Sequence, residues 1–202
     1  MKLFYSRTSP YVRKVMILLH ETGQLADVEL VSVSGTPVNP GTMPVDHNPL
    51  GKIPALLPDD GPAMFDSRVI CRFLDDRAGG KLYPSGPALW PVLTLEAMAD
   101  GITDAAILMV YESRVRPEEL RMPAWLDAQW LKVSRALDAL ETSWLAELQG
   151  PFSMGVAAIG SALEYLDLRH GARDWRAGRP NLAAWQKEFS KRPSMLATVP
   201  EE

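Results

Sequence analysis

The sequence predicts an α/β N-terminal domain followed by an all-helical C-terminal domain. The first part of the chain alternates short β-prone runs with amphipathic segments, whereas the later part has apolar residues only at helical spacing. Between them, Gly79-Gly80 and the Pro- and Gly-rich run that follows have the composition of a linker. We therefore place an α/β domain at residues 1–78, a linker at 79–88 and a helical domain at 89–202.

The N-terminal domain is predicted to have the element order β-α-β-α-β-β-α. The four expected strands are residues 2–6, 28–33, 53–57 and 63–65, of which the last two are joined by a turn containing Pro, Asp and Gly. The stretch at 34–51 is rich in Gly, Pro and Asn, and is expected to hold an irregular short helix.

Two serines mark helix starts in this domain. Ser9 precedes Pro10, and a serine N-cap followed by proline at the first helical position predicts a helix from about Tyr11 to Glu21. Ser67 is expected to cap the third helix of the domain, which runs to about Arg77.

Apolar residues recur at intervals of three and four along the C-terminal part, which predicts amphipathic helices. The three stripes are Leu95, Met98, Ile102, Ala105 and Met109, then Trp130, Val133, Leu137, Leu140 and Trp144, and finally Val156, Ile159, Leu163 and Leu166. Ser153 is expected to cap the third of these helices, although the acidic partner of a capping box is missing. A last helix is expected from about Leu182 to Lys191, ended by Pro193.

The composition argues against several classes of protein. A chain of 202 residues with 47% hydrophobic residues is long and apolar enough to bury a sizeable core. Its 21 basic and 25 acidic residues give a net charge of −4, which argues against nucleic acid and anionic membranes as partners. Charges interrupt every apolar run before the roughly 20 residues of a membrane span, so we expect a cytoplasmic protein.

The cysteine and histidine content restricts the chemistry further. Cys71 is the one cysteine, which excludes intramolecular disulfides, thiolate metal clusters and a CxxC redox pair. It falls inside a predicted helix, where a small half-buried apolar residue is expected. The residues His20, His47 and His170 have no ligand spacing, so no metal is expected. Any sulfur chemistry must use a thiol that a ligand brings.

Three separated segments of the N-terminal domain together resemble the glutathione transferase superfamily. They are Ser9 at a helix start, Gly51-Lys52-Ile53-Pro54 before the third strand, and Phe65-Asp66-Ser67 before the third helix. Residues 8–14 (TSPYVRK) and 48–54 (NPLGKIP) are similar to those of bacterial, serine-type members. The resemblance covers nearly the whole chain. It implies a thioredoxin-like N-terminal domain with an all-α C-terminal domain, glutathione as co-substrate, and a homodimer.

The resemblance also implies where glutathione binds. A cis bond before Pro54 would turn the backbone N–H and C=O of Ile53 outward to pair with the cysteinyl part of the tripeptide. Asp66 would meet the γ-glutamyl ammonium and Ser67 would hold its carboxylate at a helix N-terminus, unless they are simply a turn residue and a cap. Lys52 is either a ligand of the glycyl carboxylate or a surface lysine.

Ser9 is the expected catalytic residue, because its hydroxyl can donate a hydrogen bond that favours the thiolate over the thiol. Lowering a thiol pKa from about 8.5 to about 7 takes about 2 kcal/mol. One hydrogen bond to a charged group contributes about that much. Ser9 as a mere helix cap is the alternative, and Tyr5, Ser6 and Thr8 are rival hydroxyls nearby.

From this resemblance we expect a glutathione transferase that activates the glutathione thiol for attack on a small electrophile. Two other functions stay open: a glutathione-dependent peroxidase or disulfide reductase, and a non-catalytic binding module of the same fold. The electrophile site is expected on the helices near Leu108, Met109 and Tyr111. Its variable side chains do not identify the substrate.

Overall fold

The computed structural model describes residues 1–200, which divide into two compact units. The first unit is Met1–Gly86 together with Pro193–Glu202, and the second is Pro87–Arg192. Residues 193–200, which we expected in the helical domain, belong to the N-terminal unit. The reason is that the short helix α8 (Pro193–Ala197) packs on the first helix of the chain. Residues 201–202, which we also expected in the helical domain, lie outside the described residues.

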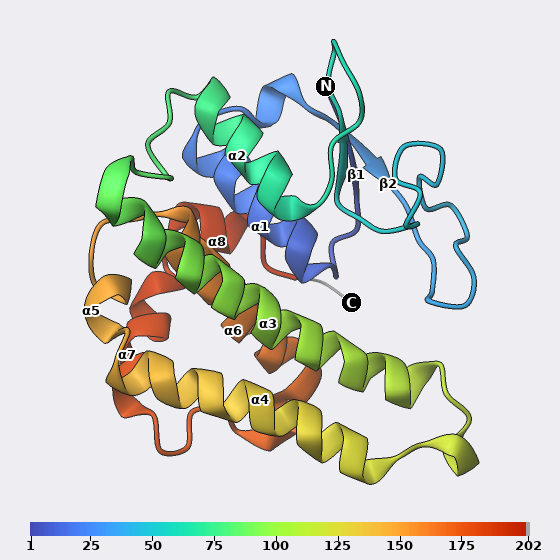
Figure 1. Cartoon of the computed structure of the whole chain (residues 1–202), viewed down its shortest axis with the longest axis vertical. Helices are drawn as coiled ribbons and strands as arrows, with labels where there is room; N and C mark the ends of the chain where they lie inside the picture. The colour runs from blue at the N-terminus through green and yellow to red at the C-terminus, as the bar shows by residue number, and fades with distance from the viewer. Residues whose placement is uncertain (201–202) are drawn as a thin grey trace. The chain divides into compact units, whose positions relative to one another are not determined.

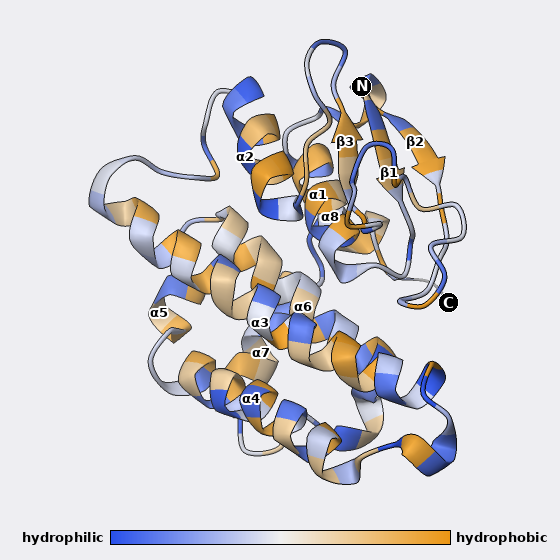
Figure 2. Cartoon of the chain, turned by 45° about the vertical axis from the view of Figure 1, so that its right-hand side comes forward, coloured by the Kyte–Doolittle hydropathy of each residue, from blue (hydrophilic) through white to orange (hydrophobic). Residues whose placement is uncertain are grey.

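In the described part of the N-terminal unit, the sheet has three strands in the order β2-β1-β3; β1 and β2 are labelled in Figure 1, and all three strands in Figure 2. The central strand β1 (Lys2–Tyr5) pairs in parallel with β2 (Glu29–Ser32) and antiparallel with β3 (Ala55–Leu57). Leu3, in the middle of the central strand, is completely buried. This small mixed sheet confirms the expected α/β character of the unit.

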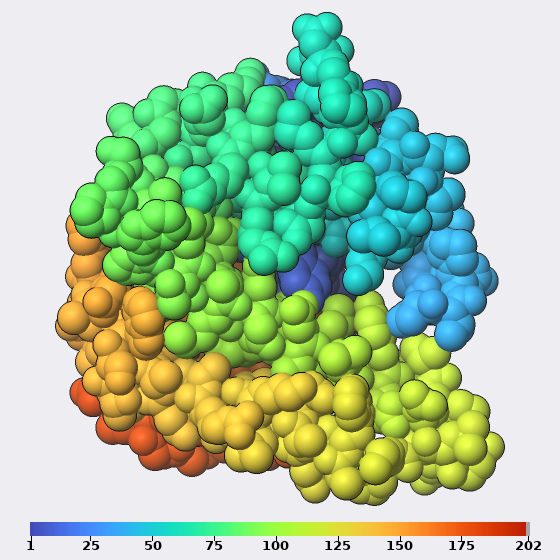
Figure 3. All heavy atoms as spheres, in the orientation of Figure 1, coloured from blue at the N-terminus to red at the C-terminus, as the bar shows by residue number. Residues whose placement is uncertain are grey.

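The fourth strand expected at 63–65 is not formed. The structure has a single antiparallel bridge there, between Leu56 and Met64. The turn before it, at 58–62, projects from the N-terminal unit (Figure 3), and α2 starts directly after Asp66. Residues 34–51 form turns in place of the short helix that we expected.

Two longer helices pack on each other in this unit, α1 (Pro10–Glu21) and α2 (Ser67–Arg77). Each contributes a fully buried apolar face; for α1 this face includes Val15 and Leu18. Cys71 in α2 is completely buried, whereas we expected a half-buried residue at this position. The packing fixes the first turn of each helix, where the candidate site residues lie.

The second unit is helical throughout its regular structure. Its helices are α3 (Leu89–Arg114), α4 (Pro123–Thr142), α5 (Leu145–Leu148), α6 (Met154–His170) and α7 (Pro180–Phe189). Along α3 and α4, apolar and polar residues alternate as expected of half-buried helices (Figure 2). The helix expected at about 182–191 is α7, which begins and ends two residues earlier, with Pro180 at its first position. It is not the last helix, since Pro193, expected to end it, starts α8.

Helix α6 is the buried helix of the second unit, and it lies tightly against α3. A Cβ atom at Gly155 would come within 2.5 Å of the Val92 carbonyl oxygen and 2.9 Å of the Leu95 Cβ. Ser153 caps α6 by accepting from the backbone N–H of Val156 at 3.4 Å, so the predicted cap is confirmed without its acidic partner.

Candidate functional site

Ser9 is the N-cap of α1, as predicted. Its Oγ accepts from the backbone N–H of Val12 at 3.3 Å, and Pro10 is the first helical residue. A hydroxyl has two acceptor lone pairs and one proton to donate, so capping leaves the proton for a ligand. The positive end of the helix dipole lies at the same point. The site therefore combines a donor with a favourable field for an anion.

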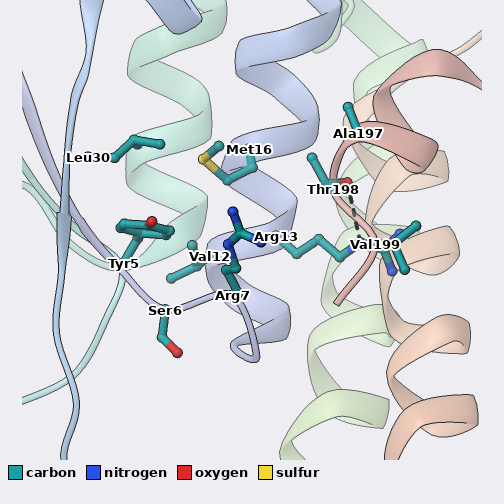
Figure 4. Close-up of a pocket in the computed structure, with 10 residues that line it drawn as sticks. All are labelled: Tyr5, Ser6, Arg7, Val12, Arg13, Met16, Leu30, Ala197, Thr198 and Val199. Atoms are coloured by element: carbon teal, nitrogen blue, oxygen red, sulfur yellow. Dashed lines mark hydrogen bonds between the residues drawn. The ribbon is translucent and has the colours of Figure 1, made fainter. Parts of the chain in front are cut away.

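The three rival hydroxyls have different surroundings. Ser6 and Thr8 lie within hydrogen-bonding distance of each other, with 3.1 Å between their side-chain oxygens. Tyr5, at the end of β1, lines a pocket together with Met16 and Leu30 (Figure 4). Of these residues and Ser9, it is Ser9 that stands at the helix N-cap.

The peptide bond between Ile53 and Pro54 is cis, as the resemblance implied. Pro54 is buried at the entrance to β3, and Ile53 is half-buried. In the sheet register Phe4 of β1 lies opposite Ala55 of β3. Since the two strands are antiparallel, the residues that precede β3 and the loop from β1 to Ser9 share one end of the sheet.

Asn48 fixes the loop before Ile53 and was missed in the sequence analysis. This residue is 2% exposed, and its Nδ2 donates to the carbonyl oxygen of Lys52 at 2.8 Å. Its Oδ1 accepts from the backbone N–H of Leu50 at 3.1 Å. Gly51, which lies between Leu50 and Lys52, has a φ of 60°, a backbone conformation that favours glycine. In the sequence, the pair Asn48-Pro49 with Gly51 two residues later indicates a turn at this position. The Lys52 side chain itself is exposed.

Asp66, and not Ser67, is the N-cap of α2. The Asp66 backbone is extended, and its Oδ1 accepts from the backbone N–H of Arg68 at 2.9 Å. The expectation that Ser67 caps the helix is wrong, because aspartate is an equally good cap and already occupies the preceding position. Ser67 is the first helical residue and is 2% exposed. Its backbone N–H belongs to the first turn, where amides lack intrahelical partners.

The Asp66 carboxylate is also an ion-pair partner of Arg68. The Arg68 Nη2 and Nε atoms lie 2.8 and 3.3 Å from its Oδ2. Partial burial of the carboxylate raises the pKa of Asp66. This effect is outweighed by hydrogen bonds from the Arg68 side chain and backbone and by the positive charges of Arg68 and Lys14, so the pKa of Asp66 lies below its ordinary value. The peptide bond from Phe65 to Asp66 is cis. Asp66 is therefore an anion near neutral pH, and its side chain is 53% exposed.

Three residues of α3 were expected near the electrophile. Met109 is 3% exposed and belongs to the core, whereas Leu108 and Tyr111 are 41% and 37% exposed. Partial burial raises the pKa of Tyr111, and deeper burial raises that of Tyr165 on α6 to about 12. Both phenols are therefore neutral near neutral pH. Of the three residues expected near the electrophile, Leu108 and Tyr111 are exposed enough to contact a ligand.

Residues 1–200 contain neither a cluster of metal-ligating side chains nor a membrane-spanning helix. The described histidine, cysteine and acidic side chains form no group of three or more that could hold a metal ion. In the same range, no helix is both long and apolar enough to cross a membrane.

Family models match both units of the chain. Residues 8–77 match the model described as glutathione S-transferase, N-terminal domain, and residues 123–187 match glutathione S-transferase, C-terminal domain. Among curated proteins, the chain is 33% identical to the uncharacterized GST-like protein YibF of Escherichia coli strain K12. That alignment covers 99% of this chain and 98% of the relative.

Solved structures include similar proteins crystallised with glutathione. A glutathione transferase family member from Pseudomonas fluorescens Pf-5 with bound glutathione is 49% identical, with a TM-score of 0.97 over 100% of this chain and 99% of that one. A structure from the same organism with bound S-(propanoic acid)-glutathione is 48% identical, with a TM-score of 0.93 over 100% of both chains. A glutathione S-transferase from Methylobacillus flagellatus KT with glutathione bound is 40% identical, with a TM-score of 0.86 over 99% of each chain.

Proposed function

Because this chain belongs to the glutathione transferase superfamily, we propose that it transfers glutathione to a small electrophile, with Ser9 as the catalytic residue. The observation that carries the proposal is the Ser9 hydroxyl, which caps α1 with a lone pair and keeps its proton for a ligand sulfur. It stands at the same end of the sheet as the Ile53-Pro54 segment. Glutathione is the co-substrate, consistent with relatives that have been crystallised with it.

In this proposal, five residues of the N-terminal unit hold the tripeptide. The backbone of Ile53, set by Pro54, pairs with the cysteinyl residue, and Asp66 meets the γ-glutamyl ammonium as an anion. Ser67, in the first turn of α2, offers its N–H and hydroxyl to the γ-glutamyl carboxylate. Lys52 contributes its ammonium to the glycyl carboxylate from an exposed position.

The reaction uses the bound thiolate as nucleophile. Ser9 donates its hydroxyl proton in a hydrogen bond to the sulfur, and the α1 dipole adds to the stabilisation of negative charge. The sulfur lone pair then forms a bond to an electrophilic carbon of the substrate, while a leaving group departs with its own bonding pair. Holding sulfur and electrophile together supplies the rest of the acceleration. A homodimer is part of the same proposal.

A relative bound to S-(propanoic acid)-glutathione favours conjugation over the alternative functions. By its name, that ligand is a glutathione substituted at sulfur, which is the type of product that conjugation yields. A peroxidase or disulfide reductase would use the same thiolate but release oxidised glutathione. A non-catalytic module would keep the fold and lose affinity for glutathione.

The proposal is tested by calorimetric titration with glutathione, together with the ultraviolet absorbance of the bound thiolate across pH. We expect Ser67→Ala to weaken binding, and Ser9→Ala to leave binding similar while raising the pKa of the bound thiol. An unchanged thiol pKa in Ser9→Ala removes the mechanism. Turnover of an aryl halide, with none of hydroperoxides or disulfides, separates conjugation from the redox alternatives.

A further inference from the structure

The C-terminal segment at residues 193–199 is attached to the helix that Ser9 caps. Helix α8 and the residues after it belong to the N-terminal unit, and α8 packs on α1. We propose that this segment positions the Ser9 hydroxyl, with the buried Arg13 side chain as the connection. The inference rests on the proposed role of Ser9 as a hydrogen-bond donor to the glutathione sulfur. It makes Arg13 and Thr198 positioning residues, which act through Ser9 and do not touch the ligand.

The Arg13 side chain holds the C-terminal segment. Its Nη2 donates to the carbonyl oxygen of Met195 at 3.2 Å, and its Nε donates to the Thr198 hydroxyl at 3.4 Å. Figure 4 shows the Arg13 side chain extended from α1 toward residues 197–199, with the bond to Thr198 dashed. The Thr198 hydroxyl in turn donates to the carbonyl oxygen of Ser194 at 2.8 Å. Arg13 is 4% exposed, so water does not readily replace a hydrogen bond that is lost here.

The Arg13 backbone holds Ser9. Its N–H donates to the Ser9 carbonyl oxygen at 3.0 Å, which is the first hydrogen bond of the α1 ladder. One residue earlier, the Val12 N–H donates to the Ser9 Oγ at 3.3 Å. These two amides fix the Ser9 peptide and its hydroxyl oxygen. Because a hydrogen bond to sulfur depends on the position and direction of the donor, a shift of Arg13 changes the bond that Ser9 can make.

The same segment also lies beside the loop that leads to Ser9. Residues 197–199 line one pocket together with Ser6 and Arg7 of this loop (Figure 4). The Ser6 carbonyl oxygen accepts from the Ser9 backbone N–H at 3.1 Å. The segment therefore adjoins both stretches of chain that hold Ser9, which are the loop before it and the first turn of α1 after it.

Amide hydrogen exchange on the full chain without glutathione tests the connection. Thr198→Val keeps the shape of the side chain and removes the hydroxyl that Arg13 and Ser194 share. We expect the amides at positions 12 and 13 to exchange about fivefold faster, because the first turn of α1 opens more often. Arg13→Met removes both side-chain bonds and should exceed Thr198→Val. Ser194→Ala is the matched control, since it removes the hydroxyl bond to Glu21 at the other end of α1 and should leave both amides at their wild-type rates.

The ultraviolet absorbance of bound glutathione across pH tests whether the connection reaches the sulfur. We expect Thr198→Val to raise the pKa of the bound thiol by about half a unit, and Ser194→Ala to leave it unchanged. Both variants lose a hydrogen bond and should be less stable than wild type, so a segment that only stabilises the fold predicts the same thiol pKa in both. Threonine carries no charge, so the rise in Thr198→Val is not the loss of a nearby cation.

Two results would overturn the inference. Wild-type exchange at positions 12 and 13 in both Thr198→Val and Arg13→Met would show that the segment does not hold the first turn. Faster exchange with an unchanged thiol pKa in Thr198→Val would show that the hydroxyl is not positioned through it. Ser9→Ala separates this failure from that of the proposed function. A thiol pKa raised in Ser9→Ala but not in Thr198→Val overturns the positioning alone, whereas an unchanged value in Ser9→Ala overturns both.

Discussion

The Arg13 guanidinium in α1 donates a hydrogen bond to the carbonyl oxygen of Met195, which follows 182 residues later. Both residues are buried, at 4% and 1% exposure. A second contact ties the other end of α1 to the same segment, since the Ser194 hydroxyl donates to Glu21 Oε1 at 2.5 Å. These two hydrogen bonds hold α8 on α1, the helix that Ser9 caps, which explains why α8 belongs to the N-terminal unit.

Replacing Arg13 with methionine keeps much of the side-chain volume and removes the hydrogen bond to the Met195 carbonyl. A buried carbonyl left without this partner costs about 2 kcal/mol in the free energy of unfolding. We expect that loss in urea unfolding, together with faster amide hydrogen exchange in 193–200. Exposed Arg135→Gln should change neither quantity, and normal exchange in Arg13→Met would show that other contacts hold α8.

Asp75 fixes the chain after α2. It is 2% exposed, and its two carboxylate oxygens accept from the backbone N–H groups of Lys81, Leu82 and Tyr83 at 3.1, 2.9 and 3.0 Å. Asp75→Asn replaces one acceptor oxygen by a donor, so we expect a loss of about 2 kcal/mol in the free energy of unfolding. Asp76→Asn, at the exposed neighbouring position, is the control for the loss of charge alone.

Local patterns in the sequence predicted much of this structure. The Ser9-Pro10 helix start and the Ser153 cap depend on residues three positions apart, so the sequence contains the information for both. The same holds for the three apolar stripes, because their spacing follows from the helical repeat, although Trp144 lies just beyond the end of α4. The cis bond before Pro54 came from the family resemblance and is confirmed.

Two kinds of feature were not predictable from the sequence: the choice between adjacent residues that can both cap a helix, and contacts between residues far apart in the chain. Asp66 and Ser67 are adjacent residues of similar capping strength, and propensity alone does not choose between them. The position of α8 depends on Arg13 and Glu21, which lie far away in the chain. In the sequence Asn48 has the pattern of an ordinary turn residue, and only the structure shows that its side-chain amide donates to the Lys52 carbonyl oxygen.

Asn48 offers a test of how the loop before Ile53 contributes to binding. Asn48→Ala removes the hydrogen bonds to Lys52 and Leu50 without changing any group proposed to touch glutathione. We expect glutathione affinity to fall several-fold, because the Ile53 backbone is no longer held in place. Asn39→Ala, an exposed asparagine in the preceding turns, is the control in the same titration. If Asn48→Ala binds normally, the loop is ordered by other contacts.

Asp66 gives a prediction about pH. Its folded-state pKa lies below the ordinary 3.8, so it stays ionised well below neutral pH, and its contribution is lost only as pH falls through that lowered value. We expect glutathione affinity to show no titration of Asp66 between about pH 5 and about pH 8. Asp66→Asn keeps a good N-cap but removes the charge, and should weaken binding about tenfold across this range. A step in the wild-type affinity that disappears in Asp66→Asn would contradict the assignment.

Ser9 and Ser153 form a matched pair that separates capping from catalysis. Each accepts an N–H from three residues ahead, at 3.3 and 3.4 Å, and replacing either by alanine should cost about 1 kcal/mol in the free energy of unfolding. Ser9→Ala alone should raise the pKa of the bound thiol, by about one unit, because it alone removes a donor to the sulfur.

Two further substitutions at Ser9 sharpen this comparison. Ser9→Asp keeps the cap and places a negative charge beside the sulfur, so stability should stay near wild type while the thiol pKa rises above that of Ser9→Ala. Ser9→Thr keeps both the cap and the hydroxyl, and should resemble wild type in both measurements. Thiol pKa values that follow stability across Ser9→Ala, Ser9→Asp and Ser9→Thr would mean that Ser9 acts only through the helix start, since a donor to sulfur predicts that the two quantities separate in Ser9→Asp.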